Sequence, residues 1–168
     1  EILESEEAEK YSYQIAKVLL DKESYFLKSI IINKGSRSNI QKGMPVLDGI
    51  NLVGRVVEVN YLSSRVLLLN DLNSRIPVII EPLGIQSILV GEGKNKPNLE
   101  YLPESHVTES GNTVFTSGKD GIFSPGIPVG KIIKEELKVK VKLFSDSNQL
   151  SFVNIILKKN KPTREIGF

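Results

Sequence analysis

Residues 29–80 read SIIINKGSRSNIQKGMPVLDGINLVGRVVEVNYLSSRVLLLNDLNSRIPVII, and this stretch decides the fold class. It consists of short β-branched runs that end in turn signals such as Lys34-Gly35 and Asp48-Gly49. The run from Val66 to Leu69 is apolar at every position, as in strands that are covered on both faces. Short strands with turn signals about every 8–12 residues predict a sandwich or small barrels.

Short β-branched runs between turn residues continue almost to the end of the chain. No stretch after residue 22 keeps the helical period of about 3.6 residues over ten positions, which excludes a doubly wound α/β fold. We therefore expect an all-β chain with two small barrel-like or sandwich domains. The first takes residues 13–82 and is completed by a final strand within residues 145–158, and the second takes residues 83–144.

The two ends of the chain differ from this pattern. EILESEEAEKY is rich in helix formers, so a short helix is predicted over residues 1–12, as the end of a coiled coil. For residues 13–20 two readings stay open: apolar spacing from Ala8 to Val18 would continue a coiled-coil seam, whereas alternation would start a first strand. We favour the strand, because almost everything downstream is β. Residues 159–168 are polar and basic and are expected to be a flexible tail.

Composition excludes several function classes. The net charge of +2 argues against a dedicated nucleic-acid binder. The chain has no cysteine and a single histidine, His106, which excludes disulfides and cysteine–zinc sites and argues against a histidine-rich metal site. The longest apolar run has four residues, against about 20 for a membrane helix. Because the chain begins at Glu1 without an initiator Met, it reads as a piece of a longer protein, which leaves room for an upstream membrane anchor.

The sequence offers little catalytic chemistry. A serine hydrolase would need His106, Asp120 and either Ser117 or Ser124 to meet, yet no G-x-S-x-G elbow is present. Gly91-Glu92-Gly93 lacks the remainder of a phosphate-binding loop. We therefore expect no enzyme activity, no cofactor and no metal.

A small-barrel nucleic-acid-binding module is the better alternative. Such a module places aromatic residues among basic ones on one surface. Tyr25-Phe26 beside Lys28 is a partial match, as is the strand expected at 137–143. On that strand Leu137, Val139, Val141 and Leu143 alternate with Lys138, Lys140 and Lys142. The lysine face is read either as a solvated face that protects a sheet edge or as a surface for an anionic partner.

The glycine and proline pattern resembles that of the rod shape-determining protein MreC family. The likeness spans residues 13–157 and includes Lys-Gly-Ser, Lys-Gly-Met-x-Val and Ser-Ser-x-Val-Leu-Leu, then Thr-Ser-Gly at 116–118 and Phe-x-Pro-Gly-x-Pro-Val-Gly at 123–130. Glycine and proline recur where a turn needs positive φ or where backbones approach closely. The positions with this structural role are Gly35, Gly43, Gly54, Gly118, Pro125 and Gly126.

The resemblance implies a non-catalytic scaffold on the extracytoplasmic, periplasmic face of the bacterial inner membrane. The parent would carry a single-pass anchor and a coiled coil, and it would position or activate the peptidoglycan synthase that elongates the cell wall. The implied partners are a class B penicillin-binding protein, MreD and MreB, together with further copies of the protein itself; nucleic acid is not among them.

Six residues are the candidates for partner binding: Thr116, Ser117, Phe123, Lys138, Lys140 and Lys142. Phe123 is the most informative, because it is a bulky apolar residue in a turn-rich segment where no strand obviously buries it. Two readings are open for it. It either contributes to a binding patch or plugs the end of its own barrel.

Overall fold

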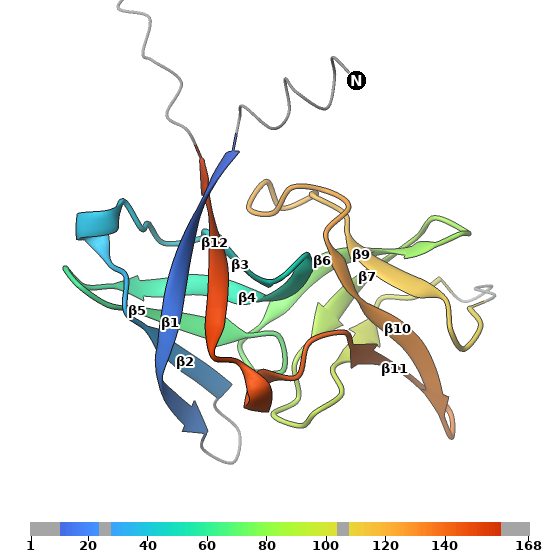
Figure 1. Ribbon diagram of the computed structural model, residues 1–168. Coiled ribbons are helices and arrows are strands. Elements are labelled where there is room, and N and C mark those ends of the chain that lie inside the picture. Colours follow the sequence, from blue (N-terminus) through green and yellow to red (C-terminus); the bar gives the residue numbers. More distant parts are fainter. Residues whose placement is uncertain (1–10, 24–27, 104–107, 159–168) are drawn as a thin grey trace, which may run out of the picture.

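The chain folds into two small β-barrels that lie side by side (Figure 1). The computed structural model describes residues 11–23, 28–103 and 108–158. Strands and two short 3₁₀ helices, η1 (Ser36–Ser38) and η2 (Ser147–Gln149), make up the regular structure of these residues. The prediction of an all-β chain with two small barrels is confirmed. Most of the helix expected over residues 1–12 falls outside the described residues, and Tyr11 and Ser12 already belong to the first strand.

The first barrel closes in the order β1-β12-β3-β4-β5-β2. Its strands are β1 (Tyr11–Glu23), β2 (Lys28–Ile32), β3 (Pro45–Asp48), β4 (Asn51–Val59), β5 (Ser64–Leu68) and β12 (Phe152–Lys158). The long strand β1 serves two neighbours: its first half pairs with β12 and its second half with β2. Residues 13–20 are therefore strand rather than helix. The strands β1 and β12 run together to one end of the molecule (Figure 1).

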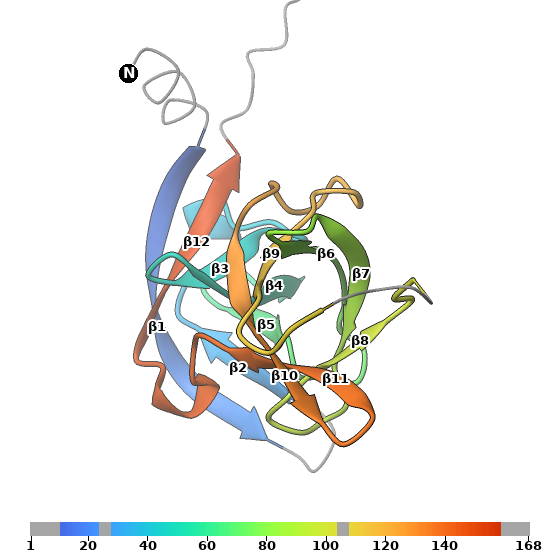
Figure 2. The ribbon, with the colours of Figure 1, turned by 90° about the vertical axis from the view of Figure 1, so that its right-hand side faces the viewer.

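The second barrel closes in the order β10-β11-β8-β7-β6-β9. Its strands are β6 (Arg75–Glu81), β7 (Ile85–Val90), β8 (Asn98–Glu100), β9 (Thr113–Thr116), β10 (Pro128–Glu135) and β11 (Lys138–Leu143). Figure 2 looks into this barrel, whose strands ring a common centre.

The boundary between the barrels differs from the expected one. Residues up to 82 were assigned to the first domain, but β6 pairs with β7 and β9 and so belongs to the second barrel. The division falls instead in the turn between β5 and β6. There Asp71 is buried, and its carboxylate accepts hydrogen bonds from the backbone N–H groups of Lys28 and Asn73, both at 2.7 Å. Strand spacing alone does not show which barrel a strand will join, because both barrels use similar short runs.

One hydrophobic core fills the first barrel, and a second core fills the other barrel and the junction between them. Neighbouring residues of the first barrel pack into different cores, because successive side chains of a strand point to opposite faces. The pairs that divide in this way, with the residue of the first core named first, are Val46 and Leu47, Val53 and Leu52, Leu68 and Leu69, and Ile155 and Ile156. This explains why the run from Val66 to Leu69 is apolar at every position: both of its faces are covered.

Glycine is needed at Gly54 because two backbones approach each other closely there, and at Gly126 because the backbone has positive φ. A Cβ on Gly54 would lie 2.0 Å from the carbonyl oxygen of Leu67, so any side chain there would push β4 away from β5. Gly126 has φ +85°, as a type II turn after Pro125 requires. The other predicted glycines fall into the same two groups: Gly35 lies against backbone, whereas Gly43 and Gly118 have positive φ.

The core that fills the second barrel and the junction allows a prediction about the loss of a buried side chain. Leu52 is fully buried in that core, so Leu52→Ala should lower the free energy of unfolding by about 3 kcal/mol. Leu62→Ala is the matched control, because Leu62 is exposed; its effect should stay within about 0.5 kcal/mol. Urea unfolding followed by circular dichroism measures both. Equal stability of the two variants would contradict the packing of Leu52 between the barrels.

Candidate partner-binding surface

Of the hydrolase candidates, Asp120 and Ser117 make hydrogen bonds within a turn. Asp120 accepts hydrogen bonds at Oδ1 from the backbone N–H groups of Ile122, at 3.1 Å, and Phe123, at 3.4 Å, so it stabilises a turn. Ser117 Oγ accepts a bond from the backbone N–H of Lys119 at 3.4 Å. His106 lies outside the described residues. Within the part of the chain that is described, no group of three or more His, Cys, Asp or Glu side chains could hold a metal ion.

Thr116 holds the loop that follows it. Its side chain is fully buried, and Oγ1 donates to the carbonyl of Ser124 at 2.7 Å and accepts from the N–H of Ile127 at 3.0 Å. These two bonds fold residues 117–127 back on β9. Thr116 therefore shapes the loop and has no surface to offer a partner, while Ser117 lies beside it, half-buried at the start of the loop.

Phe123 is not a surface residue. Only 4% of it is exposed, and it packs in the core that spans the second barrel and the junction. Of the two interpretations of Phe123, its burial favours the one in which the side chain fills the protein interior. It packs in the junction between the barrels and not only at the end of its own barrel. Its neighbour Ile122 is 44% exposed and was missed, because nothing in the sequence shows which of two adjacent apolar loop residues turns inward.

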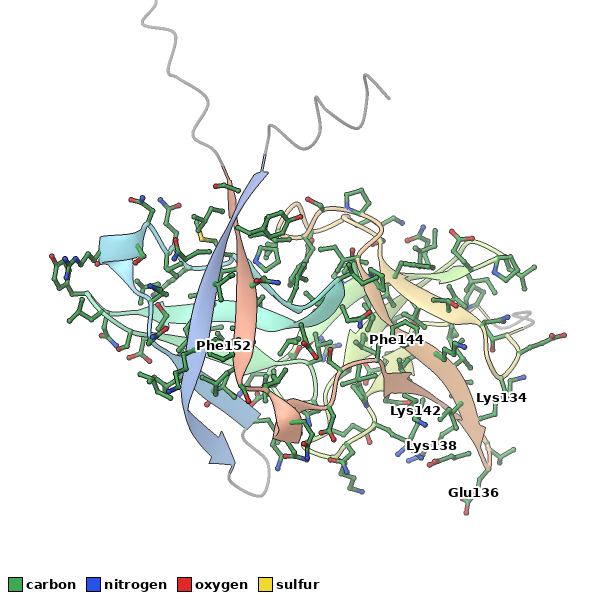
Figure 3. All side chains as sticks on the ribbon, viewed as in Figure 1. Lys134, Glu136, Lys138, Lys142, Phe144 and Phe152 are labelled. Carbon is green, nitrogen blue, oxygen red and sulfur yellow. The ribbon has the colours of Figure 1, made fainter. Side chains whose placement is uncertain are left out.

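The lysine face of β11 is present, but it does not protect an edge. β11 pairs with both β10 and β8 in the closed barrel, so the edge-protecting interpretation is wrong. Lys138 and Lys142 are exposed, whereas the Lys140 side chain is largely covered and its Nζ lies 3.8 Å from a carboxylate oxygen of Glu92. Figure 3 shows Lys138 near the tip of the β10–β11 hairpin and Lys142 farther back along the strand.

An apolar groove of about 560 Å³ lies between the barrels. We call it the inter-barrel groove; its main lining residues are Tyr13, Ile15, Ile50, Ile127, Pro128 and Ile156. A smaller hollow of about 220 Å³ adjoins it through Ser124 and Ile156 and is lined by Met44 and Ile122. The groove thus combines strands β1 and β12 of the first barrel with the 117–127 loop and the start of β10 in the second.

Exposed apolar side chains continue from the groove along β1 and β12. Tyr13 and Ile15 are each 62% exposed, and Phe152 is exposed opposite Lys17 on the paired strand. Ala16 is buried, so the inner face of β1 is the alternate one. Exposed apolar side chains that gather on one face mark an interaction site more often than scattered residues do. The alternation of Tyr13 and Ile15 with Gln14 and Ala16 was the sequence signal that could have located it.

Comparison with known proteins assigns the chain to a family. The sequence matches the family described as rod shape-determining protein MreC, barrel core, over residues 18–157. The chain belongs to the MreC family. The resemblance seen in its glycine and proline pattern is thereby confirmed.

The curated MreC relatives are longer than this chain. The cell shape-determining protein MreC of Caulobacter vibrioides is 39% identical over 146 residues, which cover 86% of this chain and 42% of that protein. The MreC protein of Cereibacter sphaeroides is 36% identical over 148 residues, 88% of this chain and 49% of that protein. The chain thus spans about half the length of these relatives.

Solved MreC structures share the two-barrel fold. The crystal structure of MreC from Pseudomonas aeruginosa superposes with a TM-score of 0.80 at 28% identity, covering 87% of this chain and 99% of that one. An MreC chain from Helicobacter pylori, solved in a complex with a penicillin-binding protein named PBP2, gives a TM-score of 0.63 at 18% identity and covers 87% of this chain and 98% of that one.

The hydrogen bonds of Thr116 lead to a prediction about the MreC loop at 117–127. Thr116→Val keeps the shape but leaves the buried N–H of Ile127 without this acceptor, so the free energy of unfolding should fall by about 2 kcal/mol. Ser117→Ala is the control and should change it by less than about 0.5 kcal/mol. Thermal unfolding of both variants measures the difference; a Thr116→Val variant as stable as the parent chain would show that the loop does not depend on this hydroxyl.

Proposed function

We propose that this chain is the non-catalytic scaffold part of a cell shape-determining protein, which binds and positions a peptidoglycan synthase, a class B penicillin-binding protein. Membership of the MreC family supports the role in cell shape. The Helicobacter pylori relative in complex with a penicillin-binding protein supports the partner. The serine-hydrolase reading is not favoured, because Asp120 and Ser117 stabilise a turn.

The inter-barrel groove is the surface that carries this proposal. Both barrels are closed, so most strands of the described residues are paired on each side and leave little edge for an added strand; β1 is the exception, because each of its halves pairs on one side. We therefore expect a partner to bind mainly to side chains, and the exposed apolar side chains of Tyr13, Ile15 and Ile50 concentrate along one groove. Because the shared core fixes the two walls, little ordering is needed when a partner enters.

The nucleic-acid alternative is less well supported by the surface. Aromatic and basic residues would have to alternate along one track. Exposed aromatic residues meet lysines only in isolated places, with Phe152 opposite Lys17 on the β1–β12 pair and Phe144 near Lys142 in the other barrel. Such isolated pairs do not form the continuous track that a nucleic-acid strand requires.

The location and the remaining partners are part of the same proposal. A relative that superposes with a TM-score of 0.76 at 20% identity is described as the major periplasmic domain of the cell shape-determining filament MreC, and we place this chain on the same side of the inner membrane. In the described residues no helix is long and apolar enough to cross a membrane. We assign anchoring to an upstream helix of the parent protein, with MreB, MreD and further copies of the scaffold as additional partners.

A single charge in the groove tests the proposal. Ile50 is 72% exposed and lies in the turn after β3, so Ile50→Asp should fold normally while placing a carboxylate on the groove wall. Binding to the soluble ectodomain of the class B penicillin-binding protein from the same organism should weaken about 30-fold or more, as for a central contact worth about 2 kcal/mol.

Leu137→Asp is the matched control for Ile50→Asp. Leu137 is fully exposed in the β10–β11 turn, beyond the end of β10 that is opposite the groove-lining Pro128, so its substitution should leave binding unchanged. Surface plasmon resonance gives the affinities, and melting temperatures verify folding. Parent-like binding by a folded Ile50→Asp variant would rule out the groove as the docking site.

A further inference from the structure

A second hollow at the junction has a different character from the inter-barrel groove. It has a volume of about 410 Å³, within the usual range for small-molecule sites. We call it the polar cleft; its main lining residues are Asn70, Asn95, Lys96, Lys142, Phe144 and Asn148. It shares no lining residue with the inter-barrel groove. Asparagine, serine and lysine side chains line it together with Leu143, Phe144 and Asp146, so its walls are more polar than those of the groove.

The walls of the polar cleft are held in place by hydrogen bonds. Ser145 Oγ bonds to Asp48 Oδ2 at 3.2 Å and so ties the segment after β11 to the first barrel. Asp146 accepts at Oδ1 from the backbone N–H of Asn148 at 3.0 Å. On the other side, the N–H of Gly93 donates to the carbonyl of Asn70 at 2.8 Å. A site whose walls are fixed in this way is preorganised for a ligand.

Positive charge at the cleft is left without a counterion. Lys142 lies directly opposite Lys131 on the paired strand β10, and both are exposed. Like charges directly opposite each other destabilise an antiparallel pair. Within the described residues neither lysine takes part in an ion pair. An anion bound at Lys142 would relieve this repulsion.

Two neighbouring lysines have carboxylate partners, which Lys142 lacks within the described residues. Lys96 is bound to Glu135, and this hydrogen bond, together with the charge of Lys96, holds the pKa of the Glu135 carboxyl below its usual range. Lys140 lies beside Glu92. Two lysines of this surface are thus matched with carboxylates, whereas Lys142 faces only another lysine across the strand pair.

Asn70 gives an independent sign of a missing partner. It is 5% exposed, and its Oδ1 is shielded and accepts no hydrogen bond within the described part of the chain. A cavity of about 10 Å³ beside it, lined also by Ser145 and Ser147, has room for about one water. An unsatisfied buried acceptor is destabilising. A ligand hydroxyl at this end of the cleft would supply the missing donor through one such water.

We propose that the polar cleft binds a carboxylated oligosaccharide. Its carboxylate would pair with Lys142, one sugar ring would lie on the 40% exposed face of Phe144, and its hydroxyl and acetamido groups would bond with Asn95 and Asn148. Figure 3 shows Lys142 and Phe144 along the same end of β11. An acidic peptide is less suited, because it would bring several carboxylates to a cleft that Asp146 also lines. The proposal does not depend on binding of a penicillin-binding protein.

The experiment compares two disaccharides that differ in charge. The probe is the disaccharide of N-acetylglucosamine and N-acetylmuramic acid, which carries one carboxylate, and the comparison is neutral N,N′-diacetylchitobiose. Titration of the ¹⁵N-labelled chain should shift amide signals around residues 142–148 and 95–96. The acidic disaccharide should bind about fivefold or more tightly than the neutral one, as for one partly exposed ion pair.

Two lysine variants separate binding from folding. Lys142→Gln should remove the preference for the acidic disaccharide, and its melting temperature should equal or exceed that of the parent chain, because a like-charge pair disappears. Lys134→Gln is the control: Lys134 is exposed on the same hairpin but does not line the cleft, so the preference should persist.

Three results would overturn the proposal. The first is equal affinity for the two disaccharides in the parent chain. The second is absence of shifts around the cleft with about 10 mM acidic disaccharide, which would put the affinity below any useful range. The third is tighter binding of a tetraglutamate peptide than of the acidic disaccharide, which would assign the cleft to an acidic protein segment instead.

Discussion

The structure depends on one packing constraint, the division of adjacent residues in the first barrel between two cores. Leu47, Leu52, Leu69 and Ile156 leave their own barrel and pack with the interior of the other. Each buried side chain of this size contributes about 1.5–3 kcal/mol. Because interiors are close-packed, such a junction cannot slide gradually to a new angle. The two barrels therefore act as one body, and any surface that spans them keeps a fixed shape.

That rigidity decides how the chain can bind. The closed barrels pair most strand backbones of the described residues on both sides, so little edge is left for an added strand. The side-chain surface where the barrels meet offers two hollows of different character. The inter-barrel groove is apolar and suits a protein partner, whereas the polar cleft suits a charged and hydroxylated one. A scaffold that holds a synthase in a set position requires this kind of fixed geometry.

The sequence predicted the fold class but only part of the surface. Strand runs, turn glycines and the all-apolar Val66 to Leu69 depend on local chemistry, so they could be read directly. The boundary near residue 82 was wrong because β6 joins its barrel through pairings with β7 and β9 that have no local signature. The burial of Phe123 and the complete inter-barrel groove were beyond reach for the same reason: alternation marks the exposed face of β1, but the groove joins Tyr13, Ile50 and Ile127, which meet only after both barrels have closed.

The features that work against stability lie close to this junction. Tyr13 and Ile15 expose apolar surface, Lys131 faces Lys142, and the buried Oδ1 of Asn70 has no partner within the described residues. Neither core needs any of these arrangements, since both are filled by other residues. A sequence usually agrees with its fold at every level, and departures from that agreement are expected at functional sites. Their gathering where the barrels meet supports our proposal that this protein acts through the surface at the junction.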